Sequence, residues 1–222
     1  MDTLEEAQKK ILKELTSDDA DVRADYLKHF ESDIEKFSKA MAHAVVNWHS
    51  LHVEVKDDEN LGQVSAWVIS AITLHILSMK LFVSGHTVAA GNLFRQVVET
   101  IALALLCSAK LEMIDKVRNG KYSTNKAMEH LLRQTKQIGI DKEAVEALRV
   151  AQLFYHNYSH PTVHTIWASV SLSEGVPYVG ASFDDEKIEI YAKEIERRLG
   201  LASVFSNFID AVKANVGKWS PA

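Results

Sequence analysis

The chain is predicted to fold as an all-α bundle of long helices, and three observations carry that prediction. Its 222 residues include only three prolines and nine glycines, below the usual shares of about 5% and about 7% for these helix breakers. Hydrophobic residues make up 47% of the chain, which is enough for a sizeable core. Apolar residues also recur with helical spacing over long segments. We therefore expect one helical domain over residues 1–222.

The first long helix is indicated by a regular apolar pattern. A short amphipathic segment comes before it, and the cluster TSDDAD at 16–21 offers side chains that can cap its start. Packing of the resulting apolar seam inside the bundle is the favoured interpretation, and a homodimer interface is the alternative. The seam alternates spacings of four and three and consists of Phe30, Ile34, Phe37, Met41, Ala44, Trp48 and Leu51.

Two further long helices are expected next. The polar stretch KDDEN at 56–60 breaks the first helix, and Asn60 can cap a helix that runs from about 61 to 83. The turn SGH then leads to a helix over 87–109. Residues 64–83 have the length of a membrane span, about 20 residues, but contain a histidine, a lysine and three serines. We interpret them as a core helix buried nearly all round, with His75 hydrogen-bonded inside, and expect no membrane partner.

Shorter helices follow. We predict helices near 110–118 and 124–138, separated by the turn RNGKYS. Asp141 then caps a helix that Pro161 stops, because proline disfavours helical geometry in the preceding residue. His160 should therefore lie at a helix end.

The C-terminal part begins with the only segment that is not predicted to be helical. Residues 163–182 are rich in β-branched residues around a turn, which favours a short β-hairpin or an ordered loop. From Asp184 or Asp185 the chain returns to helix until about residue 216. Glu194 and Arg198 stand four residues apart and support this helix.

Charge and cysteine content limit the class of protein. The net charge of −5 and the pI of about 6.1 do not favour nucleic acid as a partner of the whole surface. Residues 110–137 nevertheless hold seven Lys or Arg against three Asp or Glu. This weak basic patch has two interpretations: an RNA contact, or a solvated face balanced by acid elsewhere. The single Cys107 lies in an apolar run, which is typical of a reduced, buried thiol in a cytoplasmic protein.

Two of the predicted helices each carry one polar line on an otherwise apolar surface. Charged groups near a core need partners, because an unpaired buried charge is costly. The two lines are therefore expected to supply each other, with Arg95, Glu99, His156 and His160 meeting in one cluster. The lines are Asn92, Arg95 and Glu99 on one helix, and Arg149, Gln152, His156 and His160 on the other.

Three kinds of site fit this cluster. His156 and His160 could bind a metal with His164 or Glu99 as a further ligand, but no histidine here has a Glu three residues before it, as di-metal bundles do. We therefore expect no metal and no cofactor. Acid–base chemistry fits better, because an imidazole exchanges protons near neutral pH and an arginine about two turns away can hold a phosphate. A structural polar network that fixes helix register remains open.

The residues also resemble a known family. The stretch SGHTVAAGNLFRQVVET, with Arg95 and Glu99, and the later stretch RVAQLFYHNYSHPTVH are similar to HEPN-like helical proteins of prokaryotes, over about residues 61–165. The resemblance implies a helical bundle, often a homodimer, and in many members a metal-independent ribonuclease of a toxin–antitoxin or antiviral system. Its active site is an Arg-x(4–6)-His motif, which Arg149 and His156 match at the widest spacing. Val150 departs from the pattern, since a polar residue usually follows the arginine.

The resemblance implies roles for the site residues. His156 would remove a ribose 2′-hydroxyl proton, Arg149 or Arg95 would stabilise the charged phosphorane, and Glu99 would orient a partner. RNA and an antitoxin or other protein would be the partners. The competing hypothesis is a non-catalytic interaction module whose polar lines are structural, and a metal-binding bundle comes third.

Overall fold

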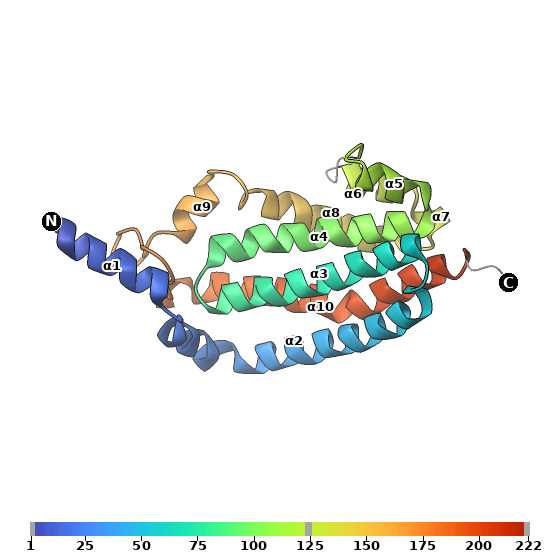
Figure 1. Cartoon of the computed structure of the whole chain (residues 1–222). Coiled ribbons are helices and arrows are strands. Elements are labelled where there is room, and N and C mark those ends of the chain that lie inside the picture. Colours follow the sequence, from blue (N-terminus) through green and yellow to red (C-terminus); the bar gives the residue numbers. More distant parts are fainter. Residues whose placement is uncertain (1–2, 123–125, 220–222) are drawn as a thin grey trace.

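Four long helices run side by side and form the body of the protein (Figure 1). They are α2 (Ala20–Val55), α3 (Glu59–Val83), α4 (Thr87–Ala109) and α10 (Ile188–Val216). The computed structural model describes residues 3–122 and 126–219. Within these ranges there is no strand, and the one β-type contact is an isolated bridge between Val170 and Pro177. The predicted all-α bundle is therefore confirmed.

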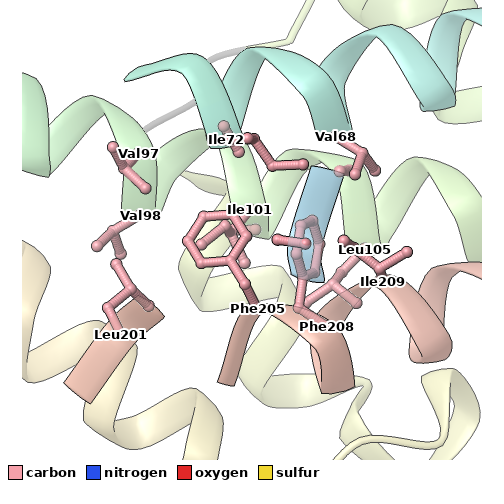
Figure 2. Packing of buried hydrophobic residues seen from close by; sticks show 14 of the residues in the cluster. Val68, Ile72, Val97, Val98, Ile101, Leu105, Leu201, Phe205, Phe208 and Ile209 are labelled. Carbon is pink, nitrogen blue, oxygen red and sulfur yellow. The ribbon is translucent and has the colours of Figure 1, made fainter. Parts of the chain in front are cut away.

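The core lies where these helices meet. Figure 2 shows Ile72 of α3, Ile101 of α4 and Phe205 of α10 directed into one cluster. The apolar seam of α2 faces the same core, because α2 packs against α3 and α10. Five of its seven residues are buried and the other two are partly buried, so the seam packs inside the bundle. The buried five are Phe30, Phe37, Met41, Ala44 and Leu51.

Helix α3 is less enclosed than the sequence predicts. Its buried side is apolar, but Ile76, Leu77 and Lys80 are exposed on the opposite side. Both α3 and α4 are long and apolar enough to cross a membrane by length and composition, and much of each lies inside the bundle. The cap of α3 also differs from the prediction. Asp58, not Asn60, accepts hydrogen bonds from the N–H groups of Asn60 and Leu61, both at 2.9 Å.

Three short helices cover the C-terminal end of α4: α5 (Glu112–Arg118), α6 (Ala127–Arg133) and α7 (Thr135–Ile138). The single helix predicted over 124–138 is interrupted at Gln134, whose φ of −122° lies outside the helical range. Residues 124 and 125 of that prediction lie outside the described residues. Gly139 ends α7 with a positive φ of 76°, which a glycine adopts without strain.

Helix α8 (Lys142–His156) packs on α4. Asp141 caps it as predicted, by accepting a hydrogen bond from the N–H of Glu143. The helix ends at His156, four residues earlier than the prediction from Pro161. The chain turns there because Asn157 donates its side-chain amide to the carbonyl of Phe154, and its own carbonyl accepts from the Thr162 hydroxyl. His160 therefore lies in a turn.

The segment at 163–182, predicted to be a hairpin or an ordered loop, is non-helical only in its second part, because its first six residues form a short helix. Helix α9 (Val163–Ala168) is followed by the loop that contains the isolated bridge. The loop is tied down by the Asp184 carboxylate, which accepts from the N–H of Leu172 and the hydroxyl of Tyr178. Asp184 also begins the short 3-10 turn η2 (Asp185–Lys187), which leads directly into α10.

Helix α1 (Leu4–Thr16) stands apart from the rest of the bundle. It begins with a capping box between Thr3 and Glu6, and it extends away from one end of the bundle (Figure 1). None of its residues is buried. Its apolar side chains are therefore without cover in the single chain.

Candidate functional site

The first polar line lies on α4 where that helix faces α8. The Nε of Arg95 donates to Oε1 of Glu99 at 2.8 Å, and the two side chains are 16% and 15% exposed. Four residues separate them, which places them one turn apart on the same face. Because both side chains are partly buried, solvent and salt screen their attraction less than that of an exposed pair. The contact is therefore stronger than an ion pair on the surface.

Two hydrogen bonds join α4 to α8 and to the turn after it. Gln152 Nε2 donates to Glu99 Oε1 at 3.2 Å, and the hydroxyl of Ser159 donates to Oδ1 of Asn92 at 2.7 Å. Helix α8 runs antiparallel to α4 (Figure 1), so His156, four residues after Gln152, is expected near the level of Arg95, four residues before Glu99. We call this set the polar interface: Asn92, Arg95 and Glu99 of α4, with Gln152, His156, Ser159 and His160.

Two exposed histidines belong to the polar interface. The rings of His156 and His160 are in contact, with their centroids 4.4 Å apart and their planes 60° apart. Both residues are exposed, so water and a substrate can reach them. The turn that brings His160 back toward His156 depends on Gly91, because a Cβ on that residue would lie 2.6 Å from the ring of Tyr158. A glycine in α4 thus lets the turn after α8 approach closely.

Arg149 belongs to the second line but forms its contacts elsewhere. Its Nε and Nη2 both donate to Oε1 of Glu146, at 2.9 and 2.6 Å. These hydrogen bonds lower the pKa of the Glu146 carboxyl and raise that of the arginine. Arg149 lies about two turns from His156 along α8, roughly 10 Å. Arg95, by contrast, is paired with Glu99, which Gln152 of α8 also bonds.

A second polar network lies deeper, and the sequence pattern did not reveal it. Arg198 is fully buried and donates to Oε2 of Glu194 at 2.7 Å. The same carboxylate oxygen accepts from the hydroxyl of Tyr155 at 2.8 Å, and Arg197 bonds the other oxygen at 2.6 Å. The Arg198 guanidinium also faces the ring of Phe82 at 4.5 Å. The only sequence signal was the four-residue spacing of Glu194 and Arg198.

His75 belongs to this inner network, as its predicted role in the core implies. Its Nε2 donates to the backbone carbonyl of Arg198 at 3.0 Å. Its ring lies among those of Phe37, Phe94 and Phe205, with centroids 5.0 to 5.4 Å away. Burial lowers the pKa of His75 to about 3, and the nearby Arg198 charge acts in the same direction. The imidazole is therefore neutral at neutral pH.

The described residues whose ligand atoms lie close enough together to bind a cation are not the histidines near the end of α8. His164 is exposed on α9, with its ring 6.0 Å from that of Phe154. Among the described residues, the grouping that could hold a cation consists of Glu14, Asp19 and His86, at the base of α1. Asp19 already accepts from His86 at 3.0 Å, and Glu14 accepts from the N–H of Ala181. Through these contacts the cluster anchors the base of α1 to the bundle.

The basic patch lies away from the histidines. Its basic residues lie in or next to α5, α6 and α7; α6 and α7 pack on α8, and α7 lies just before its start, whereas His156 ends that helix. Part of its charge is offset within the fold, since Arg118 bonds Glu59 at 3.1 Å. About 20 Å of α8 separates the patch from the histidines.

Comparison with protein-family models, with curated proteins and with solved structures gave no match.

Proposed function

We propose that the polar interface is an acid–base site that cleaves single-stranded RNA without a metal ion. The observation that carries this proposal is the ring contact between the exposed imidazoles of His156 and His160, at the end of a helix whose Gln152 is hydrogen-bonded to the partly buried Arg95–Glu99 pair. Two imidazoles close together can hold one proton and accept another, which is what a phosphodiester transfer requires. An arginine expected near the same level supplies the positive charge for a phosphate.

The proposed reaction assigns a role to each of these residues. His156 takes the proton from a ribose 2′-hydroxyl, and the 2′-oxygen forms a bond to phosphorus while the bond from phosphorus to the 5′-oxygen breaks. His160 donates a proton to the leaving 5′-oxygen. The products are a 2′,3′-cyclic phosphate and a 5′-hydroxyl. Arg95 stabilises the charge of the phosphorane, and Glu99 holds the arginine in place through its 2.8 Å hydrogen bond. The basic patch on α5 to α7 guides the RNA strand.

This activity suits a toxin–antitoxin or antiviral system in the cytoplasm. An antitoxin or another protein partner would regulate it by covering the exposed histidines.

A chelator experiment tests the proposal. Single-stranded RNA is incubated with the purified protein in excess chelator, beside His156→Ala, His160→Ala and Arg95→Ala variants. The wild type is expected to cleave the RNA, and each variant to lose at least about tenfold in rate, since general acid–base catalysis contributes about 10²- to 10⁴-fold. His43→Ala is the matched control, because His43 is exposed on α2 outside the polar interface. Arg149→Ala separates the two arginines, and a smaller loss than for Arg95→Ala is expected.

The second candidate is a non-catalytic interaction module, favoured by one observation. Gln152 and Ser159 donate hydrogen bonds to side chains of α4, as expected if the polar interface only fixes helix register. That function predicts no cleavage by any form of the protein and a lower melting temperature for Glu99→Gln. Cleavage that appears only with added zinc or manganese would contradict both candidates and favour the metal-binding bundle.

A further inference from the structure

An apolar groove runs along the outside of the bundle between α8 and α10. Its cavity volume is about 760 Å³, within the range of about 300 to 1,000 Å³ that is typical of binding sites. Helix α4 forms its floor, with α8 and α10 as its two walls. The residues that define the groove include Val98 and Ile101 of the floor, Leu148 and Ala151 of α8, and Leu201 and Val204 of α10.

The two ends of the groove carry opposite charges. At one end the Arg197 guanidinium lies 4.2 Å from the centre of the Phe154 ring, near the last turn of α8. It shares the Glu194 carboxylate with Arg198, so these three residues leave one positive charge in excess at this end. At the other end stands Asp141, the cap of the same helix. Helix α8 has 15 residues, so the charges are about 20 Å apart along the groove. Val150 and Val204 are exposed at its rims. The groove is thus long and apolar inside, with a positive charge at one end and a negative charge at the other.

Helix α1, which we call the arm, has a matching shape and pattern. Its 13 residues span about 20 Å, the length of the groove. One face is apolar and uncovered. The other residues are three glutamates, three lysines, Gln8 and Thr16; Glu5 and Glu6 lie in the first turn, and Lys13 lies in the last. The apolar face consists of Leu4, Ala7, Ile11, Leu12 and Leu15, whose large side chains are all at least half exposed.

We propose that the arm of a second copy of this chain lies in the groove, and that two copies exchange arms reciprocally. The arm cannot reach the groove of its own chain without losing its anchor. Oε1 of Glu14 accepts from the N–H of Ala181 at 2.9 Å, and this contact holds the base of the arm while the rest extends away from its own bundle (Figure 1). A two-fold arrangement gives both copies the same contact.

Charge fixes the direction of the arm in the groove. Glu5 and Glu6 lie toward Arg197, and Lys13 lies toward Asp141, so the arm runs antiparallel to α8. Its equal numbers of glutamates and lysines also distinguish it from a helix that lies on a lipid surface, where basic residues dominate the polar face. A protein groove with one charge of each sign matches this pattern better. The dimer therefore uses the arm and groove, and leaves the seam of α2 in the core.

Sedimentation of charge-insertion variants tests the exchange. The wild type is expected at twice the 24.9 kDa mass of the chain. Ile11→Glu in the arm and Val204→Glu in the groove should each sediment as monomers, because each places a charge in the apolar contact. Both side chains are about half exposed in the single chain, so its fold should survive. Leu77→Glu on the exposed side of α3 is the matched control and should remain dimeric.

Mixing the two monomeric variants sharpens the test. The Ile11→Glu chain keeps a good groove and the Val204→Glu chain keeps a good arm, so an equimolar mixture should form a heterodimer with one working contact. A wild type that sediments at the mass of one chain overturns the proposal. So does a dimer that survives Ile11→Glu or Val204→Glu, or a mixture that stays monomeric.

Disulfide trapping tests the direction of the arm. An Ala7→Cys chain mixed with an Ala151→Cys chain should crosslink on oxidation, because both positions lie toward the Arg197 end. An Ala7→Cys chain mixed with an Ala144→Cys chain should not, because Ala144 lies near Asp141. The native Cys107 is buried, which raises its thiol pKa to about 12 and keeps it out of the reaction. Preferential crosslinking to Ala144→Cys would contradict the charge argument.

Discussion

Replacing His75 with glutamine should remove a specific part of the acid sensitivity of the fold. The imidazole is fully buried among three aromatic rings, and its pKa lies near 3 in the folded chain. In the unfolded chain the value is the ordinary one, about 6.5. In the unfolded state the imidazole therefore binds a proton below about pH 6.5, whereas in the folded state it binds one only below about pH 3. Folding stability consequently falls as the pH is lowered through this window.

The size of the effect follows from the two pKa values. Each unit of pKa difference corresponds to about 1.4 kcal/mol, so the full loss reaches about 5 kcal/mol near pH 3. Between about pH 7.5 and about pH 5.5 the same relation predicts a loss of roughly 1.4 kcal/mol from this one histidine. A glutamine does not titrate, and its amide can still donate to the carbonyl of Arg198. The His75→Gln variant should lose less stability than the wild type over this interval, by about that amount.

Urea unfolding followed by circular dichroism measures this difference. The free energy of unfolding is determined for both proteins at each pH, and the change with pH is compared rather than the absolute values. His43→Gln is the matched control, because it makes the same side-chain change at an exposed position of α2. Equal pH dependence in the wild type and in His75→Gln would refute the argument that burial keeps this imidazole neutral.

Two further predictions follow from the packing of charge and backbone. Glu194→Gln should cost about 3 to 5 kcal/mol of stability, measured by urea unfolding, because the buried Arg198 would lose its carboxylate partner; a loss below about 1 kcal/mol would contradict this account. Gly91→Ala should cost about 1 to 3 kcal/mol, since the new Cβ would overlap the Tyr158 ring. Gly200→Ala is its matched control in α10, where a Cβ meets nothing within 4 Å; equal effects of the two changes would argue against the overlap.

Local signals predicted the long helices well. The helices expected at 61–83 and 87–109 and the C-terminal helix ending near 216 match α3, α4 and α10 within two or three residues at most ends. These segments have strong apolar periodicity and clear polar or glycine-containing breaks, so local and tertiary preferences agree. The end of α8 was mispredicted because Pro161 only sets a limit to the helix. The hydrogen bonds of Asn157 end it earlier, and the turn that follows brings Tyr158 close to Gly91, which is far away in the sequence.

The polar lines were predictable in part for the same reason. Helical spacing correctly placed Arg95 and Glu99 on one face, and the need for partners correctly suggested that α8 supplies one, which is Gln152. Spacing alone could not show that Arg149 turns to Glu146 on its own helix. Nor could it show that Arg198 is fully buried, because the side chains that enclose it come from α3, α4 and α8. Such partners depend on how the helices pack.

Tyr155 of the inner network and His156 of the polar interface are consecutive residues of α8, so the inner network can position the exposed imidazole. The hydroxyl of Tyr155 bonds Glu194 in the interior, while His156 stands exposed beside it. The buried bond fixes the last turn of α8, and through it the backbone that carries His156, without using the imidazole itself. Removing the bond with Tyr155→Phe should therefore loosen the position of His156 and lower the rate of the proposed RNA cleavage, while leaving both histidines in the chain. A variant that loses stability but keeps the full cleavage rate would show that the interior network does not position the site.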